Sequence, residues 1–403
     1  MQEKAKEPEI RFAGFTGAWE QRSLGEICVP VQRNDPYSHA PVMMITASSG
    51  FIYQSVRYSF DNSGQSLQKY TLLKKGELAY NHGASKLRPF GSCFALNVKE
   101  ARIPFVYHSF AVNDDDPEFV SLELNGTNVE KQLRKLVSSG ARMDGLLNIS
   151  FDDYGTVTLP LPSIDEQKKI SSFFLKLDSL LTLHQRKYEK LLNIKKSMLE
   201  KMFPKEGEVV PEIRFKGFTG AWEQRKFSKL YKRSSEKNDG SIGIERNITV
   251  ATMQFKSDIR LSSDDYLKTY FTFKVGDIAF EGHQSKEFRY GRFVENDIGD
   301  GVVSHIFTVF RPIQRFDLHF WKYAINSENL MQKILSRSTK ASTMMHDLVP
   351  EDFLNETFLV PSIDEQKAVG KFLHQIDNLL TLHQRKLEML KNVKQAFLEK
   401  MFV

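Results

Sequence analysis

PEIRFAGFTGAWEQR, residues 8–22, returns as PEIRFKGFTGAWEQR at residues 211–225, and this repeated stretch decides the architecture of the chain. Only Ala13 and Lys216 differ between the two blocks. Three further blocks recur downstream: PSIDEQK at 162–168 and 361–367, LTLHQRK at 181–187 and 380–386, and LEKMF at 199–203 and 398–402. A chain that carries the same motifs twice in the same order is a tandem duplication of one fold.

The spacing between the copies changes along the chain. The opening block recurs after 203 residues and the three later blocks after 199, so the second copy is four residues shorter between them. The intervening segments, 23–161 and 226–360, share little beyond echoes such as KKGELAY at 74–80 and KVGDIAF at 274–280. When two copies of a fold keep the same flanking blocks but differ in the segments between them, we expect those segments to present two different binding surfaces.

The duplication divides the 403 residues into four predicted segments. We expect a first binding domain at 1–162, a long helix at 163–204, a second binding domain at 205–361 and a second long helix at 362–403. With 26% charged and 41% hydrophobic residues, the composition is typical of soluble globular proteins. No apolar run approaches ~18 residues and the N-terminus has no apolar signal core, which predicts a cytoplasmic location. Cys28 and Cys93 lack metal-ligand spacing, so we expect buried free thiols.

The net charge of +6 is concentrated in the two predicted helices. Residues 165–203 carry nine basic and five acidic side chains, and residues 364–402 carry seven and five. The remainder of the chain is balanced. Any phosphate-binding surface on the two domains must therefore be a local patch.

The downstream blocks predict long helices that pair with each other. Ser163 and Ser362 are expected N-caps, followed by Asp-Glu-Gln in the first turn, where side-chain oxygens satisfy free N–H groups. Apolar residues then step by three and four over about four heptads, so each helix requires a helical partner. About 40 residues make a rod of ~60 Å. Antiparallel pairing would give pseudo-twofold symmetry, and the predicted pairing residues are Leu177, Leu181, His184, Tyr188, Leu191, Ile376, Leu380, His383, Leu387 and Leu390.

Polar residues interrupt both seams at matching places. His184 matches His383, and Lys195 matches Lys394. We interpret them as devices that fix the register, in preference to a catalytic or metal role. Four further apolar residues widen the stripe beyond a two-helix seam and favour a partner helix from another protein: Leu180, Ile194, Leu379 and Val393.

The two divergent segments predict α+β domains with polar loops in equivalent positions. Short β-rich runs occur at 41–45, 77–80, 105–112, 302–310 and 357–360, and one amphipathic helix is expected at 119–137 and another at 318–335. Such loops fit either ordinary polar surface or contacts to bases and phosphates, and their matching placement keeps the second interpretation open. The candidate DNA-binding residues are Asn81, His82, Ser85, Lys86, Arg88, His283, Gln284, Lys286, Arg289 and Arg292, with Arg142 and Lys340 in a second loop at 138–144 and 336–343.

Catalytic motifs are missing from the sequence. FAGFTG and FKGFTG lack the preceding strand and the spacing of a cofactor loop, so we interpret Trp19, Trp222 and their flanking phenylalanines as packing plugs. NDPY at 34–37 has one proline too few for an amino-methyltransferase motif and is interpreted as a turn. No nucleotide-binding GxxxxGK[ST], HExxH or paired CxxC occurs, so neither phosphate hydrolysis nor metal chemistry is indicated.

The repeated blocks closely resemble the specificity subunits of type I restriction-modification systems, especially those of low-GC Gram-positive bacteria. The resemblance rests on PEIRFxGFTGAWEQR, PSIDEQK, LTLHQRK and LEKMF, and it covers essentially the whole chain. It implies two target-recognition domains that read the halves of a bipartite DNA site, separated by two antiparallel helices. It also implies two modification and two restriction subunits as partners in a bacterial cytoplasm. S-adenosylmethionine, ATP and Mg²⁺ are then expected on those partners and not on this chain.

Two consequences follow for the target. Because the divergent segments differ, we expect unlike half-sites and an asymmetric sequence. Because a ~60 Å rod spans more than one ~34 Å turn of DNA, we expect an unread spacer of several base pairs.

Two other classes of protein stay open as alternatives. A self-sufficient DNA methyltransferase would bind S-adenosylmethionine on the isolated chain. A non-catalytic coiled-coil scaffold would show no salt-dependent affinity for DNA.

Overall fold

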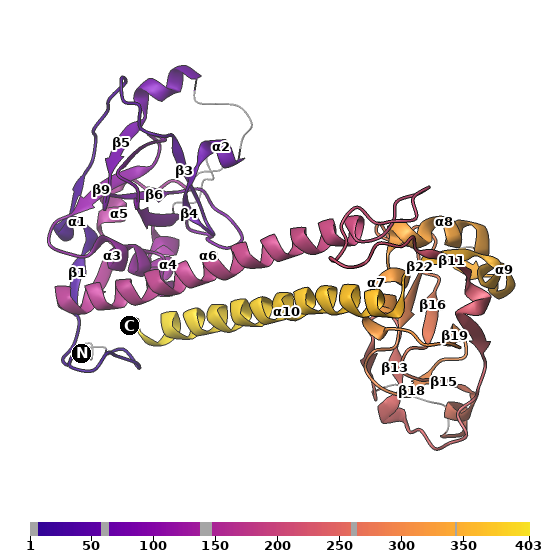
Figure 1. Cartoon of the computed structure of the whole chain (residues 1–403). Helices are drawn as coiled ribbons and strands as arrows, with labels where there is room; N and C mark the ends of the chain where they lie inside the picture. Colours follow the sequence, from indigo (N-terminus) through magenta and orange to yellow (C-terminus); the bar gives the residue numbers. More distant parts are fainter. Residues whose placement is uncertain (1–6, 58–63, 138–146, 259–263, 343–344) are drawn as a thin grey trace. The chain divides into compact units, whose positions relative to one another are not determined.

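The computed structural model describes residues 7–57, 64–137, 147–258, 264–342 and 345–403. Its contacts divide the chain into two compact units, one of Met1–Leu183 with Lys386–Val403 and the other of His184–Arg385. The two long helices, α6 (Ile164–Lys201) and α10 (Ile363–Lys400), each contribute to both units. Each unit therefore combines one divergent segment with a part of both helices (Figure 1).

The first unit is built on a four-stranded antiparallel sheet. Its strand order is β2 (Cys28–Pro30), β9 (His108–Val112), β6 (Leu78–Asn81) and β7 (Ser92–Ala95). Three strand pairs surround it: β1 (Glu20–Ser23) with β10 (Thr158–Leu161), β3 (Met43–Thr46) with β4 (Gly50–Tyr53), and β5 (Thr71–Lys74) with β8 (Glu100–Ile103). The helices are α1 (Leu24–Ile27), α2 (Gln54–Arg57), α3 (Pro117–Leu124), α4 (Thr127–Leu136) and α5 (Phe151–Gly155).

The second unit repeats this topology. Its sheet has the order β12 (Tyr231–Ser234), β19 (Thr308–Pro312), β16 (Ile278–Glu281) and β17 (Arg292–Glu295). The pairs are β11 (Glu223–Lys226) with β22 (Thr357–Val360), β13 (Ile248–Thr249) with β14 (Gln254–Phe255), β15 (Phe271–Phe273) with β18 (Gly301–Val303), and β20 (Thr339–Ala341) with β21 (His346–Leu348). The helices are α7 (Leu318–Ile325), α8 (Glu328–Ser338) and α9 (Pro350–Asn355). The predicted α+β tandem repeat is confirmed.

The single amphipathic helix predicted in each divergent segment is wrong, because each is broken into two helices. Asn125 ends α3, where its side chain donates to the Cys93 carbonyl of β7. Asn326 ends α7, and its side-chain Nδ2 donates to the Phe293 carbonyl of β17 at 2.9 Å. The predicted loop at 336–343 is also partly wrong, since it begins as the end of α8 and continues as β20. The corresponding loop at 138–144 lies outside the described residues.

The two long helices pack antiparallel, as predicted. In the first unit the Phe173 and Phe397 ring centroids are 5.0 Å apart, and Lys394 Nζ lies 2.6 Å from Asp178 Oδ1. In the second unit the matching contact joins Lys195 Nζ to Asp377 Oδ1 at 2.7 Å. The seam positions are shielded in every turn: Leu177, Ile376, Leu380 and Leu387 are buried, and Leu181, His184, Tyr188, Leu191, His383 and Leu390 are half-buried.

The opening block of each copy clamps the start of a long helix. Arg11 donates to both carboxylate oxygens of Glu166 at 2.7 Å, and Arg214 does the same to Glu365 at 2.6 and 2.7 Å. Both glutamates are buried, and the predicted N-cap is seen at Ser362, whose hydroxyl accepts from the Glu365 N–H at 3.4 Å. A buried carboxylate requires a charged, hydrogen-bonding partner, and the arginine supplies it.

The tryptophan plugs are confirmed. The Trp19 ring contacts those of Phe119 and Phe402, with centroids 5.6 and 6.3 Å apart. Trp222 contacts Phe203 and Phe320 in the same way, at 5.8 and 5.9 Å. Each tryptophan thus packs the GAWEQR block of one copy against the LEKMF block of the other, at the end of α10 in the first unit and of α6 in the second.

Candidate functional site

The site is built on two loops that follow equivalent strands, the β6–β7 loop (82–91) and the β16–β17 loop (282–291). In the first, the Ser85 N–H donates to the Arg88 carbonyl and the Ser85 hydroxyl accepts from the Arg88 N–H, both at 3.0 Å. Ser285 and Phe288 make the same two bonds at 2.9 and 3.0 Å. The two loops therefore share one backbone frame although their sequences differ.

A glycine closes both loops. Gly91 and Gly291 adopt positive φ angles of 84° and 80°. A Cβ at either position would lie 2.6 Å from the carbonyl oxygen of Asn81 or Glu281, respectively. Only glycine fits this combination of conformation and close approach.

At the base of the first loop, the candidate residues Asn81 and His82 face the protein. Asn81 Nδ2 donates to the Ile45 carbonyl at 3.2 Å, and its Oδ1 accepts from the Gly83 N–H at 2.9 Å. His82 is buried, and its Nε2 lies 2.6 Å from the Val106 carbonyl. These side chains fix the loop on the sheet.

Further along the first loop, the candidates separate into inward and outward side chains. Arg88 is half-buried and donates to the Asn125 carbonyl, and burial lowers the pKa of its guanidinium. Ser85 is engaged in the loop frame described above. Lys86 is exposed. Arg142 lies outside the described residues.

The second loop lies against the β20–β21 hairpin. The His346 N–H donates to the Gly282 carbonyl at 2.8 Å, and His283 forms a bridge with Met345. The side chain of Gln284 bonds His346 Nε2. Lys340 is exposed on β20 of this hairpin. The structure thus places His283 and Gln284 against the hairpin that carries Lys340.

The arginines at the second loop differ in whether their side chains bond within the protein or are exposed to solvent. Arg292 Nε donates to Glu281 Oε2 at 2.7 Å, and its Nη2 donates to the Ala251 carbonyl at 2.8 Å. Its guanidinium also covers the Phe288 ring. Arg289 and Lys286 are exposed. Arg292 therefore holds the loop to the sheet, whereas Arg289 and Lys286 face solvent.

Beside the second loop lies a cavity of about 760 Å³ between α6, α7 and β17. Two ion pairs lie on its lining, Lys195 with Asp377 and Lys322 with Asp297. Burial, with a contribution from nearby Asp297, raises the pKa of Glu295 on its wall. No group of three or more His, Cys, Asp or Glu side chains able to hold a metal ion occurs in the described part of the chain.

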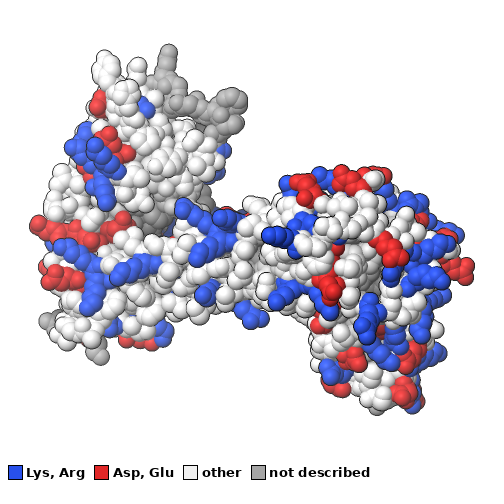
Figure 2. Space-filling model, in the orientation of Figure 1, with Lys and Arg blue, Asp and Glu red and all other residues white. Residues whose placement is uncertain are grey.

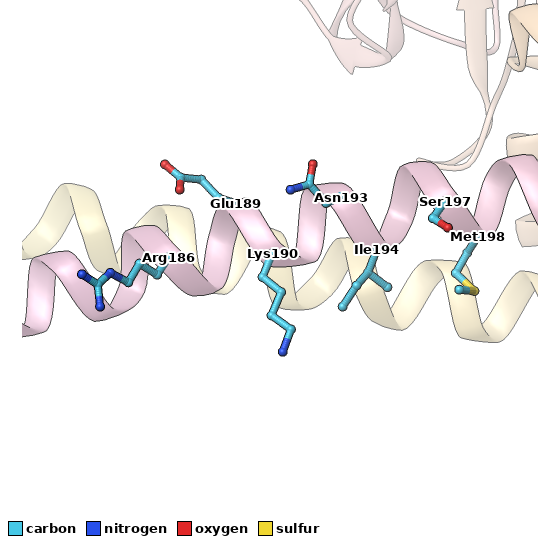
Figure 3. A pocket seen from close by; sticks show the side chains of 7 residues that line it. All are labelled: Arg186, Glu189, Lys190, Asn193, Ile194, Ser197 and Met198. Carbon is cyan, nitrogen blue, oxygen red and sulfur yellow. The ribbon is translucent and has the colours of Figure 1, made fainter. Parts of the chain in front are cut away.

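Charge is mixed on the surface of both units. Lys and Arg side chains are interspersed with Asp and Glu on the face shown in Figure 2. In the second unit, α6 has a shallow depression lined by Arg186, Lys190, Ile194 and Met198, among others (Figure 3). None of the helices among the described residues is long and apolar enough to cross a membrane.

Comparison with known proteins finds similarity both in sequence and in fold. No protein-family model matches the chain. The curated type I restriction enzyme MjaVIII specificity subunit of Methanocaldococcus jannaschii is 22% identical over 303 residues, which cover 71% of this chain and 69% of that protein. The crystal structure of a type I restriction-modification system S subunit from M. genitalium aligns over 99% of both chains with a TM-score of 0.61 and 12% identity, which shows a shared fold.

In sequence the chain is similar to a curated type I specificity subunit, and it shares the fold of a type I S subunit. This finding confirms the family resemblance carried by the repeated blocks. The narrower resemblance to Gram-positive members stays a prediction.

Sequence reasoning missed several residues that support the long helices and the loops. Arg11 and Arg214 were not singled out, although both lie in the repeated opening block and both glutamate partners lie in PSIDEQK. The sequence signal that could have found them is an arginine and a glutamate that recur together in both copies, in blocks that are otherwise kept. His346 and Asn125, by contrast, lie in divergent segments, where no repeat marks them.

Proposed function

We propose that the chain is the DNA sequence-specificity subunit of a type I restriction-modification complex. Each unit reads one half of an asymmetric, bipartite DNA target. The observation that carries this proposal is a pair of equivalent loops. They have the same backbone hydrogen bonds, each stands on its own sheet of the same topology, and their exposed side chains differ. A fixed frame with variable side chains is what recognition of two unlike half-sites requires.

The chemistry is assigned to partner subunits. Two modification subunits methylate adenine in the half-sites, and two restriction subunits cleave unmodified DNA. S-adenosylmethionine, ATP and Mg²⁺ bind to these partners, and this chain supplies no catalytic residue. The complex acts in the bacterial cytoplasm.

The helices set the spacer and dock the modification subunits. Each has 38 residues, or ~57 Å at ~1.5 Å per residue, which exceeds one ~34 Å turn of DNA. Leu180 and Leu379, which lie outside the seam, are 43% and 44% exposed. Their exposure supports a further helical partner on this face.

The proposal is tested by co-expressing the chain with its modification subunit and mapping methylated adenines across the host genome by single-molecule sequencing. A motif with two unlike halves and a fixed gap is expected. A contiguous palindrome would contradict the proposal. If a stable complex forms and no motif appears, the coiled-coil scaffold becomes the better explanation, and it also predicts no DNA affinity that falls with salt.

A further inference from the structure

We propose that Leu87 and Glu287 determine which bases the two loops read. Leu87 favours thymine, and Glu287 favours cytosine. This inference rests on the proposed function, since it assigns specificity to the same loops.

The two residues occupy the same place in matched loops. Both loops have ten residues, the same serine-centred hydrogen bonds and the same closing glycine. Superposing the frames pairs Lys86 with Lys286 and Leu87 with Glu287. The loop thus keeps a cation at one position and changes chemical class at the next.

Both variable side chains are exposed, and Glu287 also lines the cavity beside the second loop. Leu87 is 62% exposed, and Glu287 is exposed, with its N–H held by the Ser285 hydroxyl at 3.2 Å. The next residue is half-buried in each loop, Arg88 in the first and Phe288 in the second. Leu87 and Glu287 therefore present exposed side chains inside the turn that the serine bonds close.

Three other polar candidates at these loops are engaged within the protein, whereas Arg289 is exposed. Arg88 donates to the carbonyl that ends α3, Gln284 bonds His346, and Arg292 bonds Glu281. Side chains with internal partners position the loop and leave base contacts to the free residues.

The chemistry of the free residues separates backbone contact from base contact. Lysine at both positions suits phosphate, which carries no sequence information. A leucine side chain makes apolar contact and matches the thymine C5-methyl group. A glutamate is repelled by phosphate and accepts a hydrogen bond from an exocyclic amino group, for which cytosine N4 is the matching major-groove donor.

The duplication supplies an internal control for the test. We would prepare the complex of the full chain with its modification subunit carrying Leu87→Glu, Glu287→Leu or, as a control for added charge in the first unit, Val29→Glu. Val29 is 51% exposed on β2, the opposite edge strand of the same sheet. Methylation motifs would be mapped for each complex.

Leu87→Glu is expected to change base preference by about ten- to a hundredfold at one position of one half-site and to leave the other half-site unchanged. Glu287→Leu is expected to do the same in the second half-site, and Val29→Glu to change neither. Unchanged motifs in both loop variants, with methylation retained, would overturn the inference. A wild-type complex that methylates no bipartite motif would instead refute the proposed function.

Replacing the shared lysines tests the other half of the inference. Lys86→Ala or Lys286→Ala is expected to weaken methylation of every site while the motif stays the same. A new base preference in either lysine variant would show that the lysine reads a base, which overturns the division of roles.

Discussion

Replacing Arg11 by alanine is expected to destabilise the first unit much more than its position in a short N-terminal segment suggests. The guanidinium donates two hydrogen bonds of 2.7 Å to Glu166, and it also donates to the Gly17 carbonyl. The Glu166 side chain is 1% exposed and that of Arg11 is 16% exposed. The substitution would leave a buried carboxylate without its counter-ion.

The size of the effect follows from this burial. Removing one partner of a buried ion pair costs about 3–5 kcal/mol. Because the Arg11 side chain retains some contact with water, we expect the lower end, about 3 kcal/mol. Since every 1.4 kcal/mol is tenfold, amides that exchange by opening of the whole unit should exchange more than about a hundredfold faster.

Hydrogen exchange read by mass spectrometry measures the two units separately. Arg11→Ala should accelerate exchange in β1 and β10 and leave β11 and β22 unchanged. Arg214→Ala is the matched control, because it removes the equivalent contact to Glu365 and should do the reverse.

A double-mutant cycle decides whether the ion pair is responsible. In a Glu166→Gln background the buried group is neutral, so Arg11→Ala should cost at least about 1.5 kcal/mol less than in the wild type. Acceleration below about tenfold in the single variant, or an equal loss in both backgrounds, would refute the reasoning.

Four further outcomes are expected. Charge reversal at Lys195→Asp should lower the free energy of unfolding, measured by urea titration, by about 1 kcal/mol, and adding Asp377→Lys should restore it if their 2.7 Å contact fixes the helix register. Burial and two nearby aspartates raise the pKa of Glu118 from 4.5 to about 7. The stability of the first unit should therefore fall as the pH rises from 4.5 to 7, and Glu118→Gln should remove that fall in a thermal-unfolding series. His319 holds the place of Glu118 in the second unit, and burial lowers its pKa. The second unit should therefore lose stability as the pH falls below about 6.5, and His319→Gln should reduce this loss. Lys86→Ala should reduce the slope of log affinity for DNA against log salt by about one, as measured by fluorescence anisotropy on the complex.

Several features of the fold could be predicted because they are local or repeated. The heptad period identified the seam, and its residues are the shielded ones in each turn of α6 and α10. The matching positions of Lys195 and Lys394 predicted residues that fix the register, and each lysine contacts an aspartate on the opposite helix. Cys28 and Cys93 are buried free thiols, as their spacing predicted.

Predictions about individual loop side chains depended on contacts that sequence does not contain. Residue type alone made Asn81, His82 and Arg88 candidates for DNA contact. In the structure they bond carbonyls that lie 36, 24 and 37 residues away along the chain. Lys86, a candidate for the same reason, is exposed.

By itself, the sequence determined that the chain holds two copies of one fold and that two amphipathic helices pair, because repeats and helical periodicity are properties of the chain and its local backbone. Only the tertiary structure decided which loop side chains face solvent, and that Trp19 packs against Phe402 from the end of the other copy. Burial and hydrogen-bond partners arise when segments that are distant in the sequence pack together and exclude water. In the divergent segments, no local sequence pattern indicates which residues make these contacts.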